Sequence, residues 1–99
     1  MGKPFREQGK KDVLIYEDWH EYLKKLGPER YMEAMDAIFK YGLDGKFPET
    51  ADMNILGLMI GIMPVIDSNN KRWLASKKSK EKMAAAREAK AYENIPTNN

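Results

Sequence analysis

Eight basic side chains fall close together near the end of this 99-residue chain. The stretch that carries them is rich in alanine, lysine and glutamate, which favour helix. A helix would arrange these cations in a row along its axis, with a rise of about 1.5 Å per residue. This rise is comparable with the spacing of phosphate charge along a duplex. The pattern therefore predicts phosphate neutralisation in a nucleic acid by Lys71, Arg72, Lys77, Lys78, Lys80, Lys82, Arg87 and Lys90.

Lysine outnumbers arginine by six to two in this basic set. Lysine makes point-charge contacts with phosphate, whereas bidentate reading of a guanine edge is the chemistry of arginine. We therefore expect any nucleic-acid binding to be sequence-nonspecific. The same pattern also fits a solvent-exposed helix that only keeps the protein in solution, and this alternative stays open.

The residues that catalysis or metal binding would need are mostly missing. The chain has one histidine, His20, and no cysteine, which excludes Cys-His nucleophiles and sites with several histidine ligands. Asp18, His20 and Glu21 do not converge on one face of a helix. No glycine-rich phosphate loop or nucleophile elbow is present. The chain is expected not to be an enzyme, with no catalytic residues, no metal site and no cofactor.

Charge is divided unevenly along the chain, although the formal net charge is only +2. Residues 1–11 carry a net charge of +3, and residues 12–69 hold five basic and eleven acidic side chains. Residues 70–90 hold eight basic and two acidic side chains. An acidic body with a basic tail indicates an anionic partner for the tail.

The apolar segment from Met53 to Ile66 is the element around which the others must be arranged. It carries no charge, and its one polar side chain is Asn54. At roughly 21 Å it is short of the ~30 Å hydrocarbon core of a bilayer, so it is predicted to be the core helix of a soluble domain. We expect it to be mostly buried, surrounded by Trp19, Leu23, Met35, Ile38 and Phe39.

Proline and glycine interrupt this apolar helix. Pro64 lacks the N–H that would bond the carbonyl of Ile60, which predicts a kink between these two residues. Gly57 and Gly61 form a G-x-x-x-G pattern, which in a soluble core more often marks the close approach of another element than helix dimerisation.

Two amphipathic helices are predicted before the apolar one. The first runs from about Asp18 to Leu26, with Asp18 as its N-cap and Gly27 as its stop. The second runs from Pro28 to about Leu43 and ends at the Asp44-Gly45 turn. Thr50 or Asp52 then caps the apolar helix.

These elements predict an all-α fold. It is a small bundle of three main helices around a central kinked apolar helix, with an extended basic C-terminal helix. The predicted divisions are a flexible arm at 1–12, a helical domain at 13–74, a basic helical extension at 75–93 and a flexible tail at 94–99. The two short helices offer limited cover for the apolar one, so the chain is also expected to form a homodimer.

Three motifs between residues 13 and 78 resemble an uncharacterised phage and prophage family, a domain of unknown function often encoded in replication regions. The motifs are Asp36-Ala37-Ile38-Phe39-x-Tyr41, the Asp44-Gly45 turn with Pro48, and Ile66-Asp67-x-Asn69-Asn70-Lys71-Arg72-Trp73. The resemblance implies a phage origin and an all-helical fold, but no established activity. The polar residues after the apolar run are expected either to form a recognition surface or to have a structural role, in which they satisfy backbone groups freed by Pro64 or interlock with the loop from Asp44 to Pro48. They are Asp67, Asn69, Asn70, Lys71 and Arg72.

Two functions are compatible with these observations. The first is a nucleic-acid-binding accessory of phage replication that acts through the basic C-terminal helix. The second is a phage-encoded inhibitor, of the anti-CRISPR kind or similar, that binds and blocks a host defence nuclease. The expected partner is thus nucleic acid or a nucleic-acid-processing protein of host or phage, with no membrane partner. The absence of an apolar leader predicts a cytoplasmic location, and the resemblance to phage proteins implies that the cell is a bacterial host.

Overall fold

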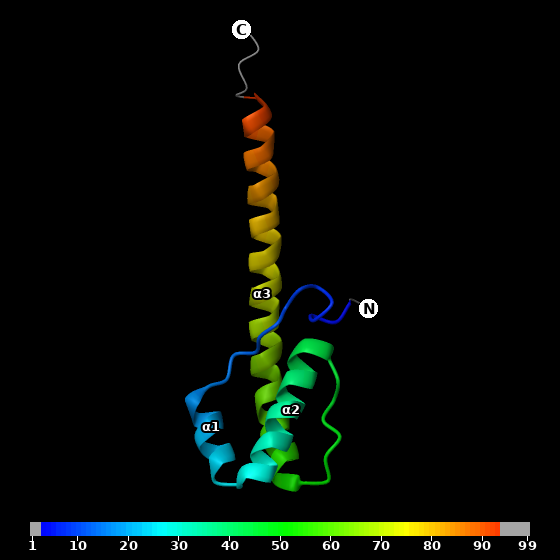
Figure 1. Cartoon of the computed structure of the whole chain (residues 1–99), viewed down its shortest axis with the longest axis vertical. Helices are drawn as coiled ribbons and strands as arrows, with labels where there is room; N and C mark the ends of the chain where they lie inside the picture. The colour runs from blue at the N-terminus through cyan, green and yellow to red at the C-terminus, as the bar shows by residue number, and fades with distance from the viewer. Residues whose placement is uncertain (1–2, 94–99) are drawn as a thin grey trace.

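The computed structural model describes residues 3–93, and side chains as far as residue 89. Within that part it contains three helices and no strands, which confirms the all-helical prediction. They are α1 (Glu17–Lys24), α2 (Pro28–Asp44) and α3 (Met53–Glu93). Figure 1 shows α1 and α2 gathered against the first part of α3, which then continues far beyond them. The molecule is accordingly elongated, with extents of 70 × 29 × 19 Å.

The corner between α1 and α2 lies where it was predicted, but α1 begins one residue earlier and ends two residues earlier, at Lys24, than the predicted helix from Asp18 to Leu26. α1 starts at Glu17, and Tyr16 occupies the N-cap position without a capping side-chain bond, so the prediction of Asp18 as N-cap was wrong. Glu17 and Asp18 lie in the first turn, where the positive end of the helix dipole favours acidic groups. Gly27 has a φ of 97° and supplies the sharp turn into Pro28.

Both ends of the segment between α2 and α3 carry the expected signals. Gly45 takes the left-handed conformation at the C-cap of α2. Asp52 caps α3, because its carboxylate accepts hydrogen bonds from the backbone N–H groups of Asn54 at 2.9 Å and Ile55 at 3.3 Å. Thr50 connects this cap to α2 by donating a 2.7 Å hydrogen bond to the Glu33 carboxylate.

The core is one cluster drawn from all three helices. From α3 only one stripe enters it, at the i, i+4, i+7 and i+11 spacing of a single helix face. The buried cluster consists of Trp19 and Leu23 of α1, Ala34 and Ile38 of α2, and Ile55, Met59, Ile62 and Ile66 of α3. Met35 packs at its edge, and Phe39 is half-buried outside it.

The prediction that residues 53–66 are mostly buried was wrong. The side of α3 that faces away from α1 and α2 leaves Met53 76% and Ile60 57% exposed. Gly57 and Gly61 lie on this outward side, and a Cβ at either would meet nothing within 4 Å. The predicted close approach of another element at these glycines is therefore also wrong. Apart from Asn54 near its start, this run carries no polar side chain that would mark the side facing solvent.

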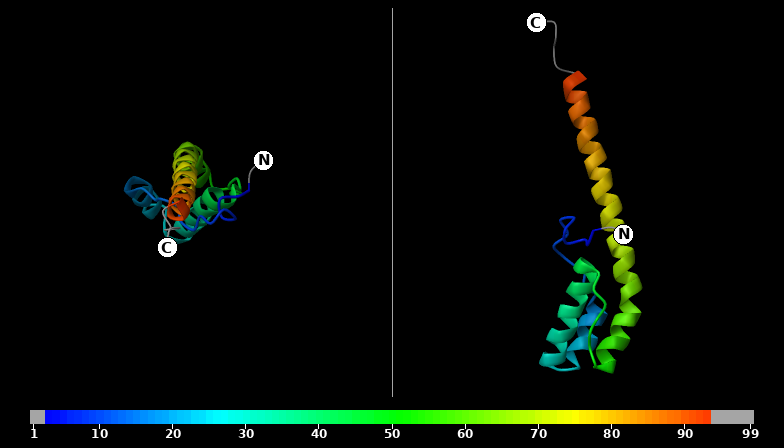
Figure 2. Two further views of the ribbon diagram at one scale, coloured as in Figure 1. Left: turned by 90° about the horizontal axis from the view of Figure 1, so that it is seen from above. Right: turned by 90° about the vertical axis from the view of Figure 1, so that its right-hand side faces the viewer.

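Helix α3 continues through Pro64 as one 41-residue element. The right-hand view of Figure 2 shows its ribbon running without a break from the bundle into the projecting half. The residues predicted as a core helix and as a basic extension thus belong to the same helix. A kink at Pro64 stays a prediction.

The N-terminal arm, from Lys3 to Asp12, crosses between α2 and α3. The Arg6 guanidinium donates to both carboxylate oxygens of Asp44 at 2.7 and 3.2 Å, and the Arg6 backbone N–H donates to the Leu43 carbonyl. This hydrogen bond from Arg6 holds the pKa of Asp44 below its ordinary value. On the other side Phe5 meets the ring of Trp73 edge to face, with 5.9 Å between centroids. The arm has a docked position, while the flexibility expected of it, and of the tail at 94–99 outside the described residues, stays a prediction.

Candidate nucleic-acid interface

The projecting half of α3 carries the predicted basic residues outside the bundle. From Ile66, the last core residue of α3, to Lys78 the helix rises roughly 18 Å. Every residue from Lys78 to Ala89 is exposed. The acidic body therefore does not cover this part of the basic tail (Figure 1).

Helix geometry sorts the basic side chains into groups. Lys71, Lys78 and Lys82 follow one another at intervals of seven and four residues, so they share one face, and all three are exposed. Lys80 and Arg87, also seven apart, share a different face. The structure thus brings three lysines into a single row, named here the lysine row, and does not bring all eight predicted residues together. The side chain of Lys90 lies outside the described part.

Lys77 has a partner inside the molecule. Its ammonium donates a 2.6 Å hydrogen bond to the backbone carbonyl of Gln8 and lies 5.5 Å from the ring centroid of Trp73. Glu81, one turn further on, is at 4.0 Å. Lys77 therefore holds the N-terminal arm against α3. Although the sequence predicts it as a binding residue, it is less available to an external phosphate than its neighbours.

A groove that the sequence did not indicate runs between the arm and α3. It is lined by Arg72 and Trp73 from α3, by the buried Lys10 from the arm, and by Leu14 from the segment that follows the arm. The Lys10 ammonium donates to the backbone carbonyl and the side chain of Asp12, so this buried cation is paired. Segments about 60 residues apart in sequence form the groove, and no local pattern could have predicted it. The one hint was the position of Trp73 in a polar stretch.

The polar residues between the core and the lysine row tie α3 to the rest of the fold. Asn70 is buried and donates a 2.9 Å hydrogen bond to the carbonyl of Gly42 in α2. Asn69 donates to the Tyr16 hydroxyl at 3.2 Å, and Asp67 accepts from the Tyr41 hydroxyl at 2.7 Å. The contacts of these three residues lie within the fold, but with Gly42, Tyr16 and Tyr41 and not with the loop from Asp44 to Pro48 or the backbone near Pro64.

The link between Tyr41 and Asp67 has a measurable consequence. Burial first, and then the hydrogen bond to Asp67, raises the pKa of Tyr41 from 10.0 to about 12. Because the folded state favours the neutral phenol, this contribution to stability is complete below about pH 10 and is lost as pH rises towards 12.

In a spectrophotometric titration of the folded protein, we expect one of the five tyrosines to ionise about two pH units above an ordinary tyrosine. Tyr41→Phe should remove that step, and Asp67→Asn should move it to lower pH. Circular dichroism at each pH serves as the control for folding. Ionisation of all five tyrosines near pH 10 in the folded protein would contradict the prediction.

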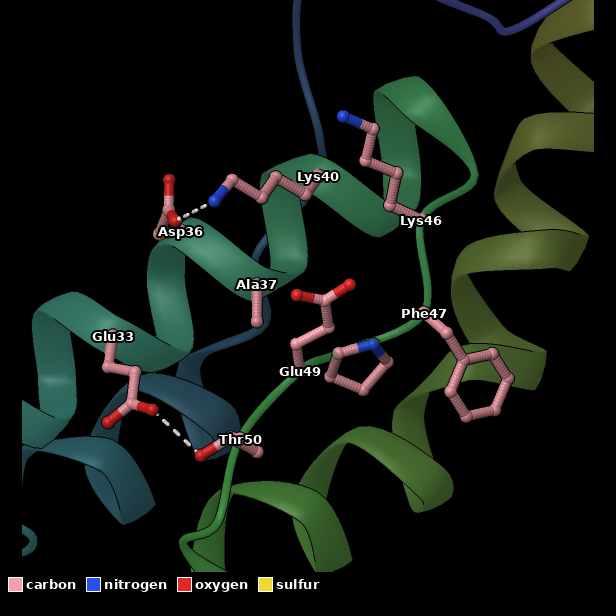
Figure 3. Close-up of a pocket in the computed structure, with 9 residues that line it drawn as sticks. Glu33, Asp36, Ala37, Lys40, Lys46, Phe47, Glu49 and Thr50 are labelled. Carbon is pink, nitrogen blue, oxygen red and sulfur yellow. Dashed lines mark hydrogen bonds and ion pairs between the residues drawn. The ribbon is translucent and has the colours of Figure 1, made fainter.

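A small hollow lies between α2 and the segment 46–50, away from the basic tail. Figure 3 shows Glu49 pointing into it, and Ala37 and Phe47 also line it. Three of its charged groups are engaged with neighbours, since Lys40 pairs with Asp36 at 2.8 Å and Glu33 accepts a hydrogen bond from Thr50. The hydrogen bond to Asp36 raises the pKa of Lys40. This arrangement ties the segment 46–50 to α2.

His20, the only histidine, joins α1 to α2, with its Nδ1 2.7 Å from the hydroxyl of Tyr31. Among the described residues no group of three or more histidine, cysteine, aspartate or glutamate side chains is placed to hold a metal ion. Over the same residues no helix has the length and apolar character needed to cross a membrane.

Comparison with known proteins gives one match. The model of a family of unknown function (DUF6291) matches residues 12–95. No curated protein and no solved structure matches the chain.

Proposed function

The chain belongs to DUF6291, a family of unknown function, and we propose that it binds nucleic acid through the phosphate backbone, using the projecting half of α3. The observation that carries this proposal is the lysine row, Lys71, Lys78 and Lys82, exposed on one face of a helix that leaves the bundle. Arg72 adds a cation to the side of this row, whereas Lys80 and Arg87 lie on the opposite face of the helix.

The acidic body is the main electrostatic objection to this proposal, because its charge repels a phosphate backbone. At physiological salt, charges separated by more than ~8 Å are largely screened from one another. The rise of roughly 18 Å from the core to Lys78 exceeds this length. The distal part of the tail therefore attracts phosphate with little opposition from the body.

Contacts of this kind position a protein without reading sequence, because the lysines reach phosphates and carry no bidentate fork for a base edge. A role as an accessory of phage replication is the setting that we propose for this binding, and it rests on the resemblance described for the three motifs.

The proposal is tested by fluorescence anisotropy with labelled duplex DNA, single-stranded DNA and RNA over a range of salt concentrations. With three phosphates neutralised, the logarithm of the association constant on duplex DNA should fall against the logarithm of salt with a slope of about −2.7. Oligonucleotides of different sequence and equal length should bind within about threefold of one another. No binding to any of the three at low salt would overturn the proposal and favour an inhibitor that binds a nuclease directly.

A further inference from the structure

We propose that two copies of the chain pair through the outward face of α3, with the two helices antiparallel. The face consists of Met53, Gly57, Ile60 and Pro64, which we call the outward stripe. This inference does not depend on nucleic-acid binding.

The outward stripe is apolar and uncovered. Its large members, Met53 and Ile60, are 76% and 57% exposed, and the position of Gly57 is open to any side chain placed there. No charged residue occurs between Asp52 and Asp67. A soluble protein that leaves such side chains in a continuous row on one face commonly uses them for association.

The order of large and small residues along the stripe fits a second copy of the same stripe. The intervals between its members are four, three and four residues, and this spacing reads the same in both directions. About a two-fold axis between Gly57 and Ile60, each large residue meets a small one of the partner. Met53 lies opposite the partner's Pro64, and Ile60 lies opposite the partner's Gly57, where the absent side chain leaves room for it.

Charge selects the antiparallel orientation. The lysine row continues the same face of α3 beyond Pro64. A parallel pair would set the two lysine rows against each other, and like charges at such short range repel. In the antiparallel pair Lys71 lies about 10 Å beyond the partner's Met53 along the helix axis. The two basic tails therefore project from opposite ends of the dimer.

The small area of the outward stripe limits the expected affinity of the dimer. Four residues on one helix cover much less than the ~800 Å² per partner of a standard interface, so the dissociation constant is expected to be on the order of tens of micromolar. Sedimentation equilibrium from about 10 µM to about 1 mM should then show the mass rising from 11.4 kDa towards twice that value. A constant monomer mass over this range would overturn the proposal.

Substitution at one exposed position distinguishes the stripe from the rest of α3. Ile60→Glu should raise the dissociation constant at least about tenfold, because it places a carboxylate opposite the partner's apolar face. The matched control is Ala75→Glu, which adds the same charge at an exposed position on the projecting half. Dimerisation retained in Ile60→Glu, or lost in Ala75→Glu, would overturn the proposal.

The absence of cysteine from the chain permits a test of orientation by disulfide cross-linking. In the antiparallel pair, eleven residues separate Met53 from the partner's Met53 along the axis, about 16 Å, too far for a disulfide. Met53→Cys alone should therefore cross-link poorly, whereas an equimolar mixture of Met53→Cys and Pro64→Cys should give the mixed disulfide. Efficient cross-linking of Met53→Cys with itself would overturn the antiparallel arrangement.

Discussion

Replacement of Lys71, Lys78 and Lys82 by glutamine is expected to weaken binding to duplex DNA on the order of 10²-fold at about 0.1 M salt. Each phosphate contact contributes about 0.9 to the salt exponent, so removing three contacts removes nearly all of the predicted slope. The three side chains are exposed, and the substitutions should leave the thermal unfolding transition unchanged. Anisotropy titrations at several salt concentrations measure both quantities.

A matched variant distinguishes the effect of the lysine row on DNA binding from the effect of total charge. Lys24, Lys25 and Lys46 are exposed on the body, and their replacement by glutamine changes the net charge by the same amount. This variant should bind with close to the original affinity and keep the original salt slope. Equal losses in both variants would show that net charge, and not the projecting row, is responsible for binding.

Met59→Ala is expected to lower the free energy of unfolding by about 2–5 kcal/mol, the usual cost of truncating a large apolar side chain inside a core. Met59 is 0% exposed and belongs to the cluster that α3 forms with Leu23 and Ile38. No polar group is introduced, so the loss arises from missing contacts and the cavity left behind. Urea denaturation followed by circular dichroism measures the change.

The neighbouring residue supplies the control for this experiment. Ile60→Ala removes a side chain of similar size that is largely exposed, so the free energy of unfolding should change by no more than about 0.5 kcal/mol. Both variants are compared at low micromolar concentration, since association would otherwise add to the apparent stability. A loss at Ile60 as large as that at Met59 would contradict the orientation of α3 described here.

The helices were predictable where local chemistry marks them. Gly27, Pro28 and Gly45 specify their turns directly, and the predicted end of α2 differs from the observed one by a single residue. Which side of α3 faces the core was not predictable, because residues 55–66 are apolar on every side of the helix. No polar side chain among them indicates the side that faces solvent. Only the packing of α1 and α2 decides which of these residues form the core.

The candidate interface was predictable as a set of cations but not as a geometry. Periodicity places Lys71, Lys78 and Lys82 on one face once the helix is known to be continuous. The contact of Lys77 with the Gln8 carbonyl joins two residues that are 69 positions apart in the sequence. Helix periodicity and capping rules concern neighbouring residues, so they could not predict it. The arm carries no sequence signal for its position beside Trp73, because the contacts that place it, with Asp44, Trp73 and Lys77, join residues far apart in the chain.

The continuity of α3 has a consequence for the cooperativity of folding. An isolated helix must first form a nucleus, at a cost of about 4 kcal/mol, and the projecting half has few large apolar side chains to offset it. Here the packed first half already provides the ordered turns, so the second half needs only propagation, one residue at a time. The projecting half of α3 therefore stays helical, with its cations regularly spaced, only while the bundle is folded. Unfolding of the bundle would abolish this spacing.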